Sequence, residues 1–560
     1  MAKDSQKKLS RLSGWALFIL ILFLAFGLRI YRFNQIPLSL FGDEVDTGYQ
    51  AYSILKTGRD YFGNFWPIHF ESFGDWRMPL YIYLAVPLMA VLGPTELAIR
   101  LPALIFSLIS IWVTYRLVKE ITRKEKIALL SCFLLAISPW QFHFSRVALE
   151  VVLFNLLLLS GLWFLLSFIK ESKNSRLVFS SVCLALSLYA YSTAKLFVPL
   201  LIFSLWLLFK KELVKKKPAI FFWLPFLLIS LPMIKDVFFG QGAARFGNIA
   251  IWSDSSIAEQ VRLQREICSL GAGAERVLHN KFSVIGRSFL ANYFKSFSGE
   301  FLFLTGDPNP RHNPTGQGQV FWVLAPLIVL GLVRLLGEWQ RSGEKKLLIP
   351  VLILALTPIP AALTQNGGTH AIRTYQSLPW WQFLAALGFS HGIFLAKNKI
   401  CKKLFTVIFA LGLAVSSFSF FHLYFNHFPH QPGSWWRWWN WGYREVFEYL
   451  DQSGSDYQRI YLSPAYDPPI VYALFYSRYP PRHIQEEISL SPIGFSKFVF
   501  ANPDLSFLKT GEEKEGDLFI VTPGYALAMG YNFDDYQTIK ILKKIAYPDG
   551  ETAFFIFKTL

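Results

Sequence analysis

An acidic pair follows the first hydrophobic stretch of the chain after a short step. Asp43 and Glu44 are adjacent, and Asp46 comes two residues later. A carboxylate held in place at a membrane surface could act as a general base, taking a proton from an attacking hydroxyl. The pair could equally bind a cation or lie in a solvated loop. Asp43 and Glu44 are nevertheless the first candidate catalytic residues, and Glu150 is a third acidic candidate.

Basic residues near the ends of hydrophobic stretches form a second candidate group. His370 and Arg373 lie about one helical turn apart, in front of a predicted helix. Two cations backed by a helix N-terminus suit a phosphate group. The alternative is a topological anchor. Charge inside a membrane segment is costly and often functional. Further cations with this kind of placement are Arg77, Arg100, Arg146, Lys195, Arg311 and His312.

Two of these positions have alternative structural explanations. Arg100 falls just inside a hydrophobic span, where a long side chain can extend back to the membrane surface. His143, Arg146 and Glu150 have i, i+3, i+7 spacing, so we expect them to share one helix face. Arg146 and Glu150 could then form a simple ion pair, although burying such a pair costs more than it returns unless function retains it.

Arg311 and His312 lie in a proline-rich segment. The stretch from Asp307 to Gly318 holds prolines at 308, 310 and 314. Proline fixes the backbone φ angle, so the segment is expected to be locally rigid where it enters the next hydrophobic span.

Composition identifies the class of protein. The chain has 560 residues, of which 53% are hydrophobic and 17% charged, and it contains 54 Phe and 18 Trp. These values are typical of a polytopic membrane protein. The net charge of +17 could indicate a nucleic-acid partner. The cations, however, gather in short loops between apolar stretches, which favours topology and lipid headgroups and excludes nucleic acid as the expected partner.

Roughly eleven transmembrane helices are predicted. Their ranges are 14–33, 97–118, 127–140, 147–169, 177–193, 195–209, 219–235, 319–336, 347–363, 373–395 and 404–424. Six short loops on one face are all basic, so that face is expected to be cytoplasmic, with the N-terminus. Pro79–Gly93 is too short for the ~20 residues of a straight crossing and is predicted to be a juxtamembrane or re-entrant helix. The odd number of spans puts the C-terminus outside.

Three long outer segments result, at about 34–96, 236–318 and 425–560. The last begins with a tryptophan cluster at 435–441, typical of a membrane interface. Strand-like stretches (Arg459–Leu462, Leu518–Thr522 and Thr552–Phe557) alternate there with helical ones (Tyr443–Leu450 and Pro469–Tyr476). We therefore predict a transmembrane domain over 1–424 and a small extracytoplasmic α/β domain over 425–560.

The order of these motifs resembles the GT-C glycosyltransferases, in particular the protein O-mannosyltransferase and lipid A aminoarabinose transferase group. The resemblance covers residues 1 to about 425. It rests on order and sidedness, and no single motif is specific. It is carried by the acidic pair, Arg77-Met-Pro-Leu-Tyr81, Glu96-Leu-Ala-Ile-Arg-Leu-Pro102, Arg146 and Glu150 after Ser138-Pro139, and His370-x-x-Arg373 before Pro379.

The resemblance implies a GT-C fold and a polyprenyl-phosphate sugar as donor. It implies that Asp43 is the general base, that Glu44 supports it or contacts the sugar, and that Glu150 lies near the acceptor or Arg146. Arg100 and Arg373 would face the donor phosphate. Relatives place a basic residue before proline, but the spacing here is Arg-Met-Pro, which weakens a phosphate role for Arg77. Asp75 is displaced from the family pattern, so no metal-binding role is assigned; a divalent metal is possible but not indicated.

The expected function is an inverting glycosyltransferase at the outer face of the cytoplasmic membrane. A single displacement needs one base and no covalent nucleophile. Arg77, Arg100, Arg146, His370 and Arg373 are the donor-phosphate candidates, and Lys195, Arg311 and His312 are other substrate-contact candidates. The acceptor hydroxyl or amine could belong to a protein, a lipid or a glycan. The alternatives are a transporter or flippase, which would place ionisable residues at the bilayer midplane, and a non-catalytic assembly protein for lipid-linked glycans.

Overall fold

The computed structural model describes residues 2–73, 75–213, 216–269, 271–453, 456–487, 494–510, 512–533 and 538–560. The chain forms two compact units. One consists of Met1–Tyr31, Ala103–Ser145 and Leu149–Phe421, and we call it the helical unit. The other consists of Arg32–Pro102, Arg146–Ala148 and His422–Leu560, and we call it the mixed unit. The predicted division into 1–424 and 425–560 stays a prediction.

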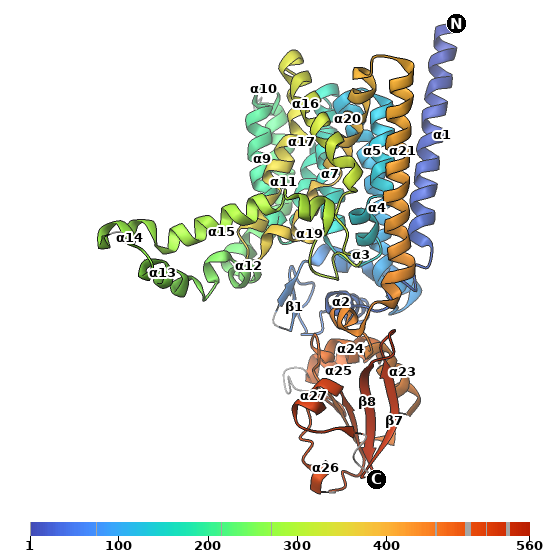
Figure 1. Cartoon of the computed structure of the whole chain (residues 1–560), viewed down its shortest axis with the longest axis vertical. Coiled ribbons are helices and arrows are strands. Elements are labelled where there is room, and N and C mark those ends of the chain that lie inside the picture. Colours follow the sequence, from blue (N-terminus) through green and yellow to red (C-terminus); the bar gives the residue numbers. More distant parts are fainter. Residues whose placement is uncertain are drawn as a thin grey trace. The chain divides into compact units, whose positions relative to one another are not determined.

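Mainly apolar helices of different lengths form the helical unit (Figure 1). They are α1 (Ala2–Ile30), α4 (Glu96–Thr122, which begins in the mixed unit), α5 (Glu125–Ala136), α7 (Val151–Glu171), α8 (Asn174–Ser187), α9 (Ala194–Leu208), α11 (Lys216–Phe239), α16 (Ala325–Ser342), α17 (Ile349–Leu356), α18 (Pro358–Ala362), α20 (Trp380–Leu395) and α21 (Lys399–His422). Short helices α6 (Pro139–Phe144) and α10 (Lys210–Leu213) join them.

Six helical stretches in the described part of the chain are long and apolar enough to cross a membrane. They are Glu96–Thr122, Val151–Glu171, Ala219–Phe239, Trp322–Ser342, Lys345–Ala362 and Lys399–His430. Each coincides with one of the predicted spans. The prediction of a helical membrane protein is therefore confirmed, whereas the count of eleven stays a prediction, because α1, α5, α8, α9 and α20 offer shorter apolar stretches.

Helices α16 and α20 pack backbone against backbone. A Cβ added at Gly331 would lie 1.9 Å from the carbonyl oxygen of Leu384. A Cβ added at Gly388 would lie 1.9 Å from the carbonyl oxygen of Leu327. Small residues allow such close approach between membrane helices, where apolar burial alone gives little driving force. These two glycines thus set the spacing of the pair.

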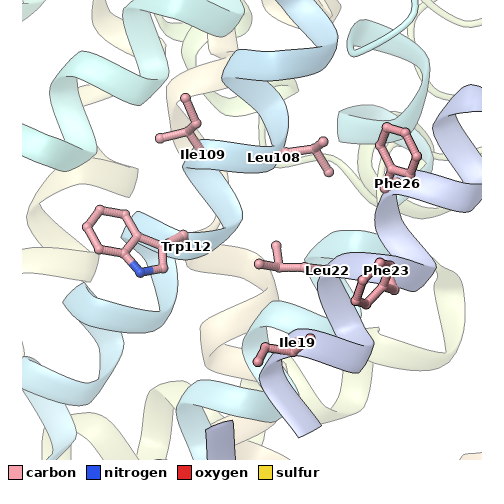
Figure 2. A pocket seen from close by; sticks show the side chains of 7 residues that line it. All are labelled: Ile19, Leu22, Phe23, Phe26, Leu108, Ile109 and Trp112. Atoms are coloured by element: carbon pink, nitrogen blue, oxygen red, sulfur yellow. The ribbon is translucent and has the colours of Figure 1, made fainter. Parts of the chain in front are cut away.

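An apolar cavity of about 420 Å³ lies between α1 and α4. Figure 2 shows the side chains that line it, all of them apolar: Ile19, Leu22, Phe23, Phe26, Leu108, Ile109 and Trp112. The exposed fraction of Phe23 is 69%. Such a lining suits the hydrocarbon region of a bilayer.

A helical arm extends sideways from the helical unit (Figure 1). It comprises α12 (Ala244–Ile249), α13 (Ile257–Glu266), α14 (Ala272–Leu278) and α15 (Lys281–Lys295). Asn280 and Ser283 cap the start of α15 reciprocally. At the other end of α15, the Asn292 amide donates to the carbonyl of Thr364, and the Ser296 hydroxyl donates to that of Gly368. The arm therefore supports the segment that leads to His370.

The mixed unit holds residues 34–96, which the sequence predicts to be the first outer segment. Helix α2 (Gly42–Thr57) precedes a two-stranded hairpin, β1 (Phe70–Ser72) and β2 (Asp75–Arg77), and then α3 (Pro79–Leu92). The acidic first turn of α2 suits a helix N-terminus, where the macrodipole favours negative charge. Residues 42–46, which the sequence left open as a loop, are thus helical.

The same unit holds a six-stranded mixed sheet near the C-terminus. Its strand order is β4-β5-β3-β6-β8-β7, with β3 parallel to both β5 and β6 and the other pairs antiparallel. The strands are β3 (Arg459–Leu462), β4 (Gly494–Phe495), β5 (Phe498–Val499), β6 (Asp517–Val521), β7 (Ile539–Ala546) and β8 (Thr552–Thr559). The helices are α23 (Tyr443–Ser453), α24 (Pro469–Tyr476), α25 (Pro481–Glu487), α26 (Phe507–Thr510) and α27 (Pro523–Ala528). The predicted strands and helices are confirmed; β4, β5 and β7 were not predicted.

One expectation about the helices is wrong. His143, Arg146 and Glu150 do not share a continuous helix, because α6 ends at Phe144 and α7 begins at Val151. The residues between them form turns. Arg146 in this break donates hydrogen bonds to the carbonyls of Arg32 and Ile36, 2.9 and 2.8 Å away. Those long-range contacts outweigh the local tendency to continue the helix.

Candidate functional site

The predicted site residues fall into two groups, one in each unit. The mixed unit holds Asp43, Glu44, Arg77, Arg100 and Arg146. The helical unit holds Glu150, Lys195, Arg311, His312, His370 and Arg373.

Arg77 clamps two carboxylates of α2. The Arg77 Nη2 atom lies 2.8 Å from Asp43 Oδ1, and its Nε atom lies 3.1 Å from Asp46 Oδ2. The second oxygen of Asp46 accepts a 2.6 Å hydrogen bond from the hydroxyl of Tyr61. Asp43 and Asp46 are three residues apart, so they lie on one face of α2. The hairpin β1–β2 positions Arg77 opposite that face.

Exposure distinguishes the two carboxylates. The Asp46 side chain is 1% exposed, whereas that of Asp43 is 39% exposed. Burial raises the pKa of Asp46, although Arg77 and Tyr61 act in the opposite direction. Burial alone would lower the pKa of Arg77, but Asp43 and Asp46 more than offset this and raise it. Arg77 therefore stays charged and fixes Asp43, the more exposed of the two carboxylates.

Glu44 and Arg100 form a buried ion pair. Glu44 Oε1 accepts a hydrogen bond from Arg100 Nε, and Glu44 Oε2 accepts one from Arg100 Nη2, both at 2.8 Å. Oε1 also accepts from the backbone amide of Ala148 at 2.8 Å. Arg100 donates in addition to the carbonyls of Pro37 and Ser39. Both side chains are at most 2% exposed, so this pair locks the start of α2 to the preceding loop.

Arg146 sits in an aromatic cage. Its guanidinium carbon lies 5.6 Å from the ring centroid of Phe33, 5.7 Å from that of Tyr424 and 5.5 Å from that of Phe425. Arg146 is fully buried. Three rings and two backbone carbonyls stabilise the cation by cation–π and hydrogen-bond interactions. In the mixed unit, Arg146 thus anchors the loop that leads to α2.

The C-terminal part of the chain supports α2 directly. Asp467 Oδ2 accepts hydrogen bonds from the backbone amide of Gly42, at 3.2 Å, and from the amide of Asn440, at 2.7 Å. The Tyr49 hydroxyl donates to the carbonyl of Tyr479 at 2.8 Å. Gln485 on α25 reaches the far end of α2. The helix that carries Asp43 and the sheet region therefore form one structure.

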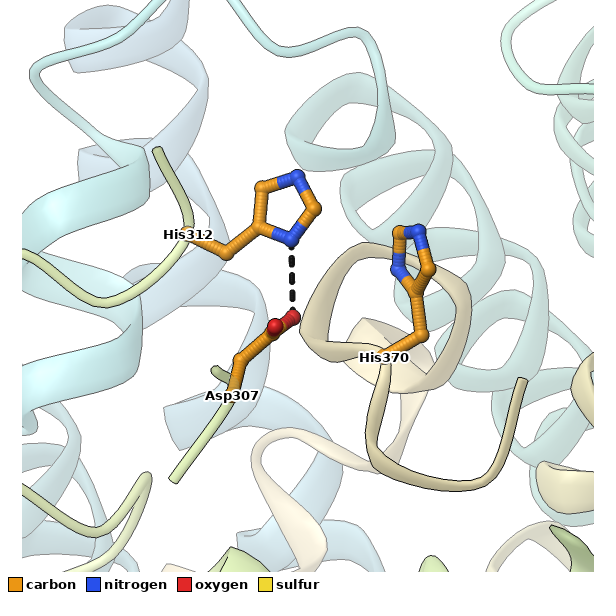
Figure 3. Close-up of side chains that lie close together, drawn as sticks. All are labelled: Asp307, His312 and His370. Atoms are coloured by element: carbon orange, nitrogen blue, oxygen red, sulfur yellow. Dashed lines mark hydrogen bonds and ion pairs between the residues drawn. The ribbon is translucent and has the colours of Figure 1, made fainter. Parts of the chain in front are cut away.

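The second group contains a cluster that the sequence did not reveal. His312 Nδ1 lies 2.7 Å from Asp307 Oδ2, and the ring centroids of His312 and His370 are 4.8 Å apart. Figure 3 shows the three side chains converging from two segments. One ligand atom from each of them lies within 4.8 Å of the others, an arrangement that could hold a metal ion. Asp307 and His312 are buried, and His370 is partly buried.

The remaining predicted residues of the helical unit have the following contacts. Arg373 Nη1 donates to Thr364 Oγ1 at 2.5 Å and to the carbonyl of Gln365 at 3.3 Å. Lys195 Nζ donates to the carbonyl of Gly242 at 2.6 Å. The carbonyl of Arg311 lies 2.8 Å from His143 Nε2. Glu150 immediately precedes α7.

Sequence reasoning missed Asp46, Tyr61 and Asp307 as site residues. The i, i+3 spacing of Asp43 and Asp46 was available as a signal once residues 42–57 are taken as a helix. No local pattern identifies Tyr61 or Asp307, because Tyr61 binds Asp46, 15 residues away, and Asp307 binds the backbone amide of Ala371, 64 residues away.

Comparisons with known proteins agree with this architecture. Residues 77–235 match the family model described as dolichyl-phosphate-mannose-protein mannosyltransferase. A search of the curated proteins found no match to the chain. Among solved structures, ArnT from Cupriavidus metallidurans in the apo state is similar with a TM-score of 0.53 at 11% identity, covering 99% of this chain and 98% of that one.

Two further structures have the same likeness. ArnT bound to undecaprenyl phosphate has a TM-score of 0.52 at 11% identity, covering 97% of each chain. The apo oligosaccharyltransferase of Archaeoglobus fulgidus has a TM-score of 0.53 at 12% identity, covering 93% of this chain and 71% of that one. At these identities the likeness is one of fold. The family match over residues 77–235 and the ArnT-like fold together confirm the resemblance to the GT-C membrane glycosyltransferases that the sequence indicated.

Proposed function

We propose that this protein is an inverting glycosyltransferase that moves a sugar from a polyprenyl-phosphate donor to an acceptor hydroxyl or amine. The observation that carries the proposal is the Asp43 carboxylate. It is partly exposed on the first turn of α2 and is held by a buried arginine at 2.8 Å. The family match and the ArnT-like fold support the donor class.

Asp43 acts as the general base. It takes the proton of the acceptor hydroxyl while that oxygen attacks the anomeric carbon. The bond from the anomeric carbon to the phosphate oxygen breaks, and the phosphate leaves with the bonding electron pair. A positioned carboxylate contributes roughly 10²- to 10⁴-fold to such a step. One displacement inverts the anomeric centre.

Arg77, Glu44 and Arg100 are positioning residues in this scheme. Arg77 orients Asp43, and the Glu44–Arg100 pair fixes the helix that carries it. This reassigns Arg77 and Arg100, both of which were donor-phosphate candidates in the sequence, because their guanidinium groups bind carboxylates of α2. Arg373 remains the proposed cation for the leaving phosphate, whose departure needs positive charge more than acid catalysis.

The finer topology is part of the same proposal. Eleven helices cross the membrane, the basic loops face the cytoplasm, and the sheet region and Asp43 face the outside. Single cysteines at residues 43 and 373 should both react with a membrane-impermeant maleimide in intact cells. Labelling of only one of them would contradict the proposed sidedness.

The reaction is tested with the purified full-length protein and a panel of labelled polyprenyl-phosphate hexoses and pentoses. The expected result is release of polyprenyl phosphate in the presence of membrane extract as a source of acceptor. Asp43→Asn should reduce release at least 100-fold, because the amide cannot take the proton. Analysis of the product anomer should show inversion.

The matched control is Asp451→Asn, which changes an exposed aspartate of α23 in the same unit. It should leave the rate unchanged. Wild-type protein that releases no polyprenyl phosphate from any member of the panel would overturn the proposed reaction. Undiminished release by Asp43→Asn would overturn the assignment of the base.

A further inference from the structure

We propose that Asp307, His312 and His370 form a site for one divalent transition-metal ion, with Zn²⁺ as the ion that fits best. The site lies within the helical unit and does not include Asp43. Its existence can be tested by metal binding alone, so the proposal does not depend on the glycosyl-transfer reaction.

The three ligand atoms are already gathered. They lie within 4.8 Å of one another, and the Asp307–His312 pair is at 2.7 Å. A tetrahedral zinc ion holds its ligand atoms roughly 3.4 Å apart, since each lies about 2.0–2.2 Å from the ion. The present separations therefore differ from those of a zinc site by about 1 Å.

The carboxylate of Asp307 has the outer-shell support that metal ligands usually have. Its Oδ1 accepts from the backbone amide of Asn309 at 2.8 Å, and its Oδ2 accepts from that of Ala371 at 2.7 Å. Hydrogen bonds of this kind fix the orientation of a ligand and are common around metal sites. The Ala371 bond also ties the segment of Asp307 to that of His370, the adjacent residue.

The loop between Asp307 and His312 is rigid for identifiable reasons. The Asn313 side-chain amide donates to the carbonyls of Thr305 and Gln317 at 2.6 and 2.9 Å. Gly306 adopts a φ of +73°, and a Cβ there would lie 2.4 Å from both Asn313 Nδ2 and Gln317 O. Only glycine fits this turn. A preformed loop of this kind lowers the entropy cost of binding an ion.

The donor set selects the type of ion. Two imidazoles and one carboxylate suit zinc and other first-row transition metals, whereas magnesium and calcium prefer all-oxygen sites. Three protein ligands leave a fourth position open, as in zinc sites that bind a water or an anionic oxygen. The site would therefore take an oxygen ligand, such as water or a phosphate oxygen, in addition to the three side chains. His370 is then a metal ligand rather than a direct phosphate contact.

The experiment uses the purified full-length protein in detergent. The protein is stripped with a chelator, incubated with ZnCl₂, desalted and analysed for metal by mass spectrometry. We expect about one zinc per chain in the wild type. His312→Gln, His370→Gln and Asp307→Asn should each retain at least tenfold less. Zinc should also raise the melting temperature of the wild type but not that of the three variants.

The matched control is His391→Gln, a histidine substitution on α20 of the same unit, which should bind zinc like the wild type. Asp307→Asn can disturb folding because Asp307 holds two backbone amides, so His370→Gln decides the result if Asp307→Asn does not elute as a monodisperse species.

Cobalt loading gives a second readout, because the visible bands of Co²⁺ bound through imidazole should be present in the wild type and absent in His370→Gln. Wild type that retains no zinc, or equal retention by wild type and His370→Gln, would overturn the site.

Discussion

The carboxylate of Asp467 accepts a hydrogen bond from the backbone amide of Gly42 at 3.2 Å, although 425 residues separate the two in the sequence. The residue after Gly42 is Asp43, the proposed base. A side chain from the C-terminal region thus holds the first turn of α2. An amide at a helix N-terminus has no acceptor within the helix. Asp467 therefore provides the acceptor that the Gly42 amide would otherwise have to find in water.

The tight approach at Gly42 gives a first prediction. A Cβ at this position would lie 2.7 Å from Asp467 Oδ2, so Gly42→Ala must displace either the first turn of α2 or the Asp467 side chain that holds it. We expect at least a tenfold loss of kcat with little change in donor KM. The double variant Gly42→Ala, Asp467→Ala removes the clash and should recover part of the loss. Gly286→Ala, at a helical position with open space around it, is the control. Full activity of Gly42→Ala would refute the positioning role.

Breaking the buried Glu44–Arg100 pair should strongly destabilise the protein. Removal of one partner leaves the other charge buried and uncompensated, which typically costs about 3–5 kcal/mol. Glu44→Gln and Arg100→Gln should each lower the free energy of unfolding by about that amount. The double variant should lower it by less than the sum of the two single effects. Denaturant unfolding in detergent provides the measurement. The control is Glu259→Gln on the arm, whose solvent-exposed ion pair with Arg262 should contribute little to stability. Additive effects would show that the two side chains are not coupled.

Backbone contact between α16 and α20 makes Gly331 sensitive to any added volume. Gly331→Ala should lower the free energy of unfolding by about 1–3 kcal/mol, because the new methyl group would meet the Leu384 carbonyl. Gly337→Ala on the same helix is the matched control. Its Cβ would come no closer than 3.7 Å to Arg341, so it should be neutral or slightly stabilising. Equal melting temperatures for the two variants would contradict the packing.

Donor recognition should depend on Arg373. A charge-assisted hydrogen bond to phosphate is worth about 1.5–3 kcal/mol, so Arg373→Ala should raise the donor KM roughly 10- to 100-fold. Arg373→Lys keeps the positive charge but cannot donate two parallel hydrogen bonds as a guanidinium can. Its donor KM should lie between those of the wild type and Arg373→Ala. Steady-state kinetics with the best donor of the panel gives the values. Arg276→Ala on the arm serves as the control, and an unchanged KM in Arg373→Ala would remove the phosphate role.

Much of the fold could be predicted because the residues that determine whether a segment is a helix or a strand lie within that segment. The bounds of α24, Pro469–Tyr476, agree with the predicted ones, since a proline opens the helix and an apolar run fills it. The helical character of the membrane segments follows from hydropathy in the same way. Strand β7 was missed although Ile539–Ala546 has partly alternating apolar residues, because its lysines at 540, 543 and 544 resemble a solvated loop.

Long-range contacts explain what the sequence could not reveal at the site. Arg146 leaves the helix that its spacing predicts because its partners, Arg32 and Ile36, lie more than 100 residues away. Asp307 is joined to the segment of His370 across 64 residues. Asp43 could be proposed from the sequence because it follows the first predicted span after a short step. Its neighbour Glu44 could not be assigned to Arg100 without the structure, since nothing in the sequence fixes which cation meets which carboxylate.

The support that residues 467–485 give to α2 bears on how this chain could be truncated or recombined. A truncation before His422 would expose the amide of Gly42 and the hydroxyl of Tyr49 to solvent, and the first turn of α2 would lose the hydrogen bond to Asp467. A chimaera with a foreign tail would face the same difficulty unless it carried equivalents of Asp467 and the Tyr479 carbonyl. The two ends of the gene are therefore expected to change together.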